Sequence, residues 1–83
     1  MEWPHKRLAR WRADRKLTYR QAGEILGCSG SYLKQIEDGP GDGHWRTPGR
    51  TIANRLQRET ADWQDGPIRS AEWDDAIELW GQR

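Results

Sequence analysis

Apolar residues recur along this chain at the three- and four-residue spacing of amphipathic helices, and turn-forming residues separate these stretches. Serine, threonine and proline at the predicted starts, and glycine at several predicted ends, are typical helix boundary signals. The predicted helices are Pro4 to about Lys16, Thr18 to Gly27, Ser29 to Gly39, Thr47 to about Thr60, and Ser70 to Trp80. Strand signals are almost absent, so the pattern predicts an all-α protein.

The apolar stripes of the predicted helices indicate one shared core. The inward positions are Leu8, Trp11, Ala22, Ile25, Leu26, Tyr32, Leu33, Ile36, Ile52, Ala53 and Leu56. The stretch 39–49 is rich in glycine and proline and is predicted to be a loop. We expect a compact bundle of four to five helices, with residues 1–60 as the main unit and residues 61–83 as a C-terminal turn and helix of the same domain.

Composition limits the chain to one small domain with a thin core, because it has 83 residues of which 34% are hydrophobic and 33% are charged. Six tryptophans supply much of the apolar area. The single Cys28 allows no internal disulfide, and no apolar run is long enough to cross a membrane or to form a signal peptide. We therefore expect a soluble cytoplasmic protein.

Charge is distributed unevenly along the chain. The formal net charge is +1, but residues 1–60 carry +5 and residues 61–83 carry −4. The first 20 residues contain seven lysines and arginines, which is an electrostatic pattern suited to a polyanion. We expect the basic first helix to neutralise nucleic-acid phosphates.

Residues 17–39, LTYRQAGEILGCSGSYLKQIEDG, have the spacing of a helix-turn-helix. Gly23 lies where the two helices must approach closely, Gly27 permits the tight turn, and Cys28 fills the apolar space beneath it. Small or long polar residues then occupy the outer face of the second helix of the motif, where they can enter a major groove. They are Ser29, Gly30, Ser31, Lys34 and Gln35.

Residues 8–18, LARWRADRKLT, followed by this motif, resemble the xenobiotic-response-element type of helix-turn-helix protein, the family of the lambdoid phage repressors and Cro proteins. The resemblance extends from about Leu8 to about Leu56. It implies a lambda-repressor-like helical fold that binds double-stranded DNA, usually as a dimer on an inverted repeat, and regulates transcription.

The resemblance implies roles for individual residues. Gly30, Ser31, Lys34 and Gln35 stand where family members contact bases, although glycine offers no side chain for this purpose. Candidate phosphate contacts are Tyr19, Arg20, Ser29, Arg46 and Thr47, and Ser29 is also a candidate helix cap. Arg12 and Glu37 match a pair that is often buried in this family, so we expect them to form an ion pair.

The last helix carries an apolar stripe whose role the sequence leaves open. Trp73, Ala76, Ile77 and Trp80 lie on one face, and we favour a homodimer interface over packing within the chain alone. These features favour a dimeric repressor that binds an inverted-repeat operator, and we expect a phage or mobile-element origin. The alternative is an antitoxin-like or adaptor module in which this helix binds another protein.

Signals of catalysis and of cofactor binding are weak. His5 and His44 lie far apart without cysteine or carboxylate at metal-ligand spacing, and Cys28 is better explained by core packing. We expect no enzymatic activity, no cofactor, no metal, no small-molecule substrate and no membrane partner.

Overall fold

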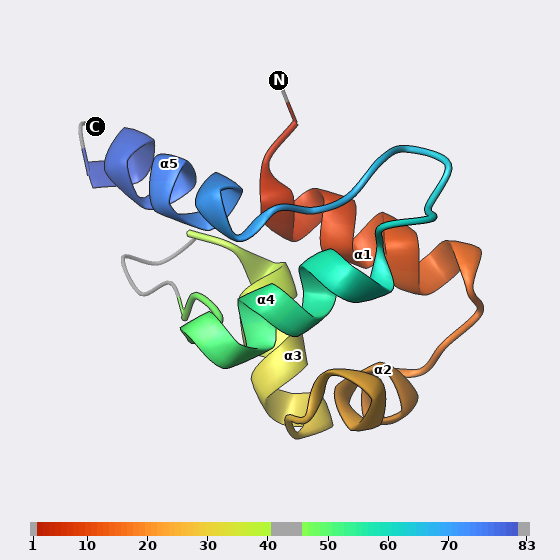
Figure 1. Ribbon diagram of the computed structural model, residues 1–83. Coiled ribbons are helices and arrows are strands. Elements are labelled where there is room, and N and C mark those ends of the chain that lie inside the picture. The colour runs from red at the N-terminus through yellow and green to blue at the C-terminus, as the bar shows by residue number, and fades with distance from the viewer. Residues whose placement is uncertain (1, 41–45, 82–83) are drawn as a thin grey trace.

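Five helices make up the computed structural model, which describes residues 2–40 and 46–81, with the side chains of 80 and 81 excepted. They are α1 (Pro4–Asp14), α2 (Tyr19–Leu26), α3 (Gly30–Asp38), α4 (Arg50–Glu59) and α5 (Ser70–Gly81). The predicted all-α bundle is confirmed. Figure 1 shows α1 across the middle of the molecule, α2 and the start of α3 at one end, and α5 at the opposite end. None of the described helices has the length and apolar character needed to cross a membrane.

The core lies between helices that pack in pairs: α3 packs against α1 and α2, α4 against α2 and α5, and α5 also against α1. Its buried side chains are Leu8, Trp11, Ala22, Leu26, Leu33, Ile36, Ala53, Leu56, Ile68 and Trp73. Most predicted inward positions are among them. Ile25, Tyr32 and Ile52 are half-buried at its edge. The fully buried indole of Trp11 supplies a large apolar area, which offsets the small number of hydrophobic residues.

The start of α4 differs from the sequence prediction. Thr47 and Pro48 were expected to cap the helix and begin it, but α4 starts at Arg50 with Gly49 as its N-cap. The backbone carbonyl of Thr47 instead accepts a hydrogen bond of 3.1 Å from the Tyr32 hydroxyl on α3. This tertiary contact accompanies an extended conformation of the chain before α4.

The start of α5 also differs, because Ser70 is the first helical residue rather than the cap. Its backbone N–H donates to the Gln57 side chain on α4 at 2.9 Å. The Glu72 carboxylate accepts a hydrogen bond of 2.7 Å from the backbone N–H of Arg69. The Glu72 carboxylate in the first turn of α5 thus provides a hydrogen-bond acceptor at the start of the helix, where the Ser70 side chain was expected to act as the cap.

Arg7 on α1 joins the N-terminal helix to the C-terminal segment. Its guanidinium lies 2.6 Å from the Glu72 carboxylate on α5. The same group donates to the backbone carbonyls of Asp65 and Gly66 at 3.1 and 2.9 Å. One side chain therefore fixes both the turn before α5 and the first turn of α5 itself.

Arg10, one helical turn further along α1, makes a second connection. It pairs with Glu2 at 2.7 Å and with Asp65 at 2.6 Å. The indole of Trp63 packs beneath Arg7 and Arg10, whose guanidinium carbons lie 5.7 and 5.6 Å from the ring centroid. The acidic C-terminal segment is thus held by the basic face of α1.

Trp73 and Ala76, two of the four predicted dimer-interface residues, lie inside a single chain. Trp73 is 2% exposed and belongs to the core, and Ala76 is buried beside it. These two residues pack within one chain because α5 folds back against α1 and α4, and the homodimer interface stays a prediction. Ile77 remains 40% exposed. Trp80 lies outside the described side chains.

The buried imidazole of His5 predicts a pH-dependent stability. His5 packs against Gly39 at the end of α3, and burial, aided by the charge of Lys6, lowers the His5 pKa from 6.5. The His5 imidazole therefore binds a proton more tightly in the unfolded chain than in the folded chain. The free energy of unfolding is highest above about pH 6.5 and falls as the pH drops below this value. We expect urea denaturation to give a lower free energy of unfolding at about pH 5.5 than at about pH 7.5.

The two histidines of the chain provide the control for this expectation. His5→Gln should flatten the dependence between these two pH values, whereas His44→Gln should leave it in place. Equal slopes in the two variants would show that His5 is not the responsible group.

Candidate nucleic-acid interface

The start of α2 is set by a reciprocal pair of hydrogen bonds. The backbone N–H of Gln21 donates to the Thr18 hydroxyl at 3.1 Å, and the Gln21 side-chain carbonyl accepts from the backbone N–H of Thr18 at 2.9 Å. This capping box satisfies two N–H groups that the helix itself cannot. It fixes where the chain leaves the segment after α1 and enters α2.

Three residues connect α2 to α3. Gly27 adopts the left-handed conformation at φ 84°, and its N–H and that of Cys28 both donate to the Gly23 carbonyl, at 2.7 and 2.8 Å. Ser29 then caps α3 by accepting a hydrogen bond of 3.1 Å from the backbone N–H of Tyr32. Burial raises the pKa of the Cys28 thiol, which keeps it protonated and suits a packing role.

Two glycines allow α2 and α3 to approach closely. A Cβ atom on Gly23 would lie 2.5 Å from the Cys28 carbonyl oxygen. A Cβ atom on Gly30 would lie 3.1 Å from the backbone nitrogen of Arg20 in the first turn of α2. Gly30 is half-buried, so its place in the structure is primarily a packing position between the two helices.

We expect Gly23→Ala to destabilise the protein by about 2 kcal/mol, because the added methyl group meets backbone rather than a movable side chain. This net loss combines a steric cost of about 3 kcal/mol with the gain of roughly 1 kcal/mol that alanine has over glycine inside a helix. Gly49→Ala is the control, since nothing lies within 4 Å of its added Cβ and its φ is −64°, so only the loss of a glycine N-cap, about 0.5 kcal/mol, applies. Urea denaturation of the two variants should differ clearly. Equal stabilities would refute the close-approach argument.

The outer face of α3 presents a row of polar side chains to solvent. Ser31, Lys34 and Gln35 are all exposed, and Leu33 and Ile36 anchor the opposite face in the core. The ammonium of Lys34 lies 3.2 Å from the Asp38 carboxylate, one turn further along the helix. Such an exposed pair within one helix contributes only about 0.3–0.5 kcal/mol, so Lys34 can exchange it for another anion.

The segment before α4 lies beside α3 because Tyr32 holds it there. In addition to its hydrogen bond to Thr47, the Tyr32 ring lies 5.7 Å from the guanidinium carbon of Arg46. Arg46 is exposed and Thr47 is half-buried. The structure therefore places Arg46 and Thr47, two of the predicted phosphate contacts, next to α3, the helix that is predicted to contact bases. Tyr32 is the residue that positions them.

The family model for the helix-turn-helix domain matches residues 6–47, just over half of the chain. The chain belongs to the helix-turn-helix domain family. The match runs from Lys6 in α1 through α2, the turn and α3, and ends at the segment held by Tyr32. This agrees with the resemblance to the xenobiotic-response-element type that the sequence indicated. No curated protein and no solved structure matches the chain.

The predicted phosphate contacts in α2 of the helix-turn-helix lie in different environments. Arg20 is exposed, and its guanidinium is 3.7 Å from Glu24. The Tyr19 ring is half-buried and lies 4.1 Å from the guanidinium carbon of Arg12. Arg20 is therefore free to reorient, whereas Tyr19 is held in place against α1. Both phosphate contacts stay predictions.

Arg12 and Glu37 lie together as an ion pair across the helix-turn-helix domain. The Nε and Nη2 atoms of Arg12 donate to the two Glu37 carboxylate oxygens at 2.8 and 3.1 Å, and Nη1 donates to the Leu17 carbonyl at 3.0 Å. The hydrogen bond to Glu37 is the main reason that the pKa of Arg12 is raised. This pair joins α1 to the end of α3 and to the entry of α2.

Arg7 and Arg10 on α1 are used differently from the sequence expectation, whereas Arg12 forms the expected pair with Glu37. Arg7, Arg10 and Arg12 are each engaged with carboxylates of the same chain. Arg15 lies over the Trp11 ring, 5.7 Å from its centroid. Part of the basic first helix therefore acts as a structural clamp, because Glu37, Asp65 and Glu72 bind its arginines from later segments of the chain.

Sequence reasoning missed two exposed arginines on α4. Arg50 is the first residue of that helix, and an added Cβ on Gly27 would lie 3.3 Å from the Arg55 guanidinium, which places Arg55 beside the turn of the motif. The pattern of charged residues on the outer face of α4 was the sequence signal that could have identified these two arginines. Within the described residues, no group of three or more His, Cys, Asp or Glu side chains is arranged to hold a metal ion.

Proposed function

We propose that this helix-turn-helix protein is a sequence-specific, double-stranded DNA-binding transcriptional regulator. The observation that carries the proposal is the α2–turn–α3 unit, which presents Ser31, Lys34 and Gln35 on one exposed face. Polar side chains on a helix of this kind fit the major groove and can reach base edges. We propose that the protein acts in the cytoplasm and that its role is DNA binding rather than catalysis.

Exposed cations around this face supply the groups that such a complex needs for phosphates. They are Arg20, Arg46, Arg50 and Arg55, from α2, the segment before α4, and α4 itself. The amide groups of the first turn of α4 add partial positive charge, since Gly49 provides no side-chain cap. Binding through these groups releases counterions and depends steeply on salt.

We further propose that the regulator acts as a dimeric repressor on an inverted-repeat operator, with phage or mobile-element origin as the context. Two copies related by a two-fold axis would place their α3 helices in successive major grooves about 34 Å apart. Exposed Ile77 on α5 supports a contact between copies, while Trp73 and Ala76 serve the core. Repression would follow from blocking the polymerase.

Selection of binding sites from random duplex DNA at about 150 mM salt tests this function. We expect an enriched inverted repeat with half-sites one helical turn apart. About four phosphate contacts in each of two subunits predict a slope near −7 for the logarithm of the binding constant against that of the salt concentration. An absence of any enriched sequence would contradict sequence-specific binding, and an enriched single half-site would contradict the dimer.

A further inference from the structure

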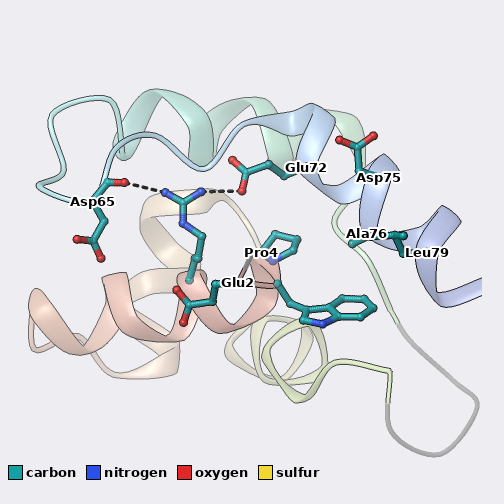
Figure 2. A pocket seen from close by; sticks show the side chains of 9 residues that line it. Glu2, Pro4, Asp65, Glu72, Asp75, Ala76 and Leu79 are labelled. Atoms are coloured by element: carbon teal, nitrogen blue, oxygen red, sulfur yellow. Dashed lines mark hydrogen bonds and ion pairs between the residues drawn. The ribbon is translucent and has the colours of Figure 1, made fainter.

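A pocket of about 520 Å³ lies between the start of α1, the turn before α5 and α5 itself. Figure 2 shows Asp65 at one end and Leu79 at the other, with Glu72 between them. In Figure 1 these elements lie at the opposite end of the molecule from α2 and the start of α3. A ligand in this pocket would therefore leave the predicted DNA-binding face open.

The floor of this α1–α5 pocket is apolar and its rim reaches solvent. Pro4 and Ala76 are buried, Trp3 is half-buried, and Leu79 is 52% exposed. An exposed leucine and an indole beside a recess of this volume can enclose one bulky apolar side chain. The pocket thus provides apolar area that this chain leaves partly uncovered.

Carboxylates dominate the charge of the pocket. Glu2, Asp65, Glu72 and Asp75 line it, against the single guanidinium of Arg7. Arg10 also bridges Glu2 and Asp65, yet carboxylates still outnumber guanidiniums by four to two. Among the described residues, Asp75 has no ion-pair or hydrogen-bond partner. The pocket is complementary to a cationic ligand.

The shape of the pocket favours a peptide over a compact small molecule. On α5 the lining follows one stripe from Glu72 through Asp75 and Ala76 to Leu79, which corresponds to about two helical turns, or about 10 Å. A groove of this length accommodates several residues of an extended or helical segment. Lysine or arginine side chains of that segment would meet the rim carboxylates, and the Trp3 indole can also stack against a cation.

We propose that the α1–α5 pocket binds a peptide segment of a partner protein that carries one bulky apolar side chain flanked by lysine or arginine. The apolar side chain enters between Trp3 and Leu79, and its cationic neighbours pair with Asp75 and the adjoining carboxylates. The site is separate from the proposed DNA-binding face, so a partner protein bound here leaves that face open to DNA.

Selection of random displayed peptides of about 12 residues against the immobilised full-length chain tests this proposal. We expect enriched sequences that combine leucine, phenylalanine or tryptophan with at least two basic residues. Asp75→Lys and Leu79→Ser should each weaken binding of the selected peptides by about ten-fold or more. Both residues are exposed, and unchanged melting temperatures would show that the variants keep their fold.

The neighbouring residue Asp74 on α5 gives a matched control. Asp74→Lys makes the same charge change as Asp75→Lys, but Asp74 does not line the pocket. This variant should leave peptide binding within about two-fold of the starting protein. Equal losses in the control and pocket variants, or enriched peptides without basic residues, would overturn the proposal.

Other occupants would give different results, each of which also overturns the proposal. If Leu79→Ser converts a dimer into a monomer in sedimentation experiments, a second copy fills the pocket. A second result would be that no peptide is enriched, while tryptamine binds the starting protein and binds Asp75→Lys more weakly. In that case the pocket takes a small organic cation. DNA binding of the same variants is measured separately, so failure of the peptide site and failure of the proposed function are distinguishable.

Discussion

Replacing Glu37 with glutamine is expected to lower the free energy of unfolding by about 3 kcal/mol. The Glu37 side chain is 4% exposed and receives two hydrogen bonds from Arg12, so the substitution leaves a guanidinium without its counter-charge. Breaking a buried pair typically costs about 3–5 kcal/mol, and the 20% exposure of Arg12 favours the lower end of this range. Urea denaturation measures the change directly.

Glu24→Gln on α2 is the matched control for this substitution. Glu24 pairs with Arg20 at 3.7 Å, but both side chains are highly exposed, so the loss should stay below about 0.5 kcal/mol. The double variant Arg12→Met, Glu37→Leu should recover most of the stability, because it removes both charges while keeping apolar volume. If Glu37→Gln is no less stable than Glu24→Gln, the pair does not stabilise the fold.

The Arg12–Glu37 pair also links stability to the predicted DNA-binding face. Arg12 touches three parts of the motif at once: the Tyr19 ring in α2, the Leu17 carbonyl before α2, and Glu37 near the end of α3. Loss of the pair would therefore loosen the orientation of α3 before the domain unfolds. Variants at this pair should be tested for DNA binding only at temperatures where they remain folded.

Local signals made most of the fold predictable. Thr18, Gly27 and Ser29 act within three or four residues of their own positions, so sequence alone identifies the caps and the turn that they form. The same reasoning failed at Thr47, where threonine followed by proline is typical of a helix start. There a contact with Tyr32, which lies 15 residues earlier, accompanies the later start of α4.

Long-range partners explain most of the remaining differences. The basic charge of α1 predicted a surface for phosphates, but the Arg7 contacts lie 58 to 65 residues away, and sequence spacing carries no information on such pairs. An amphipathic stripe likewise does not specify what covers it. For Trp73 and Ala76 the cover is α1 and α4 of the same chain, whereas the exposed side of α5 carries Ile77 and Leu79.

Replacing Lys34 and Gln35 together with alanine is expected to weaken binding to the selected operator by about 100-fold or more. Each side chain that contacts a base edge typically contributes about 1–3 kcal/mol to discrimination between bases. Binding to unrelated duplex DNA should fall much less, because Arg20, Arg46, Arg50 and Arg55 remain to contact phosphates. Fluorescence anisotropy with the two duplexes at one salt concentration gives the ratio of affinities.

The control for this pair is the variant Lys6→Ala, Gln64→Ala, which removes the same two residue types from exposed positions outside α3. It should keep the ratio of specific to non-specific affinity. Arg20→Ala, in contrast, should weaken binding to both duplexes by a similar factor and reduce the salt slope by about one contact for each subunit. If the Lys34→Ala, Gln35→Ala variant keeps both its melting temperature and the affinity ratio, then α3 does not read the operator. The exposed face of α3 would then be an ordinary solvated helix surface, and the peptide site on α5 would become the main functional surface of this domain.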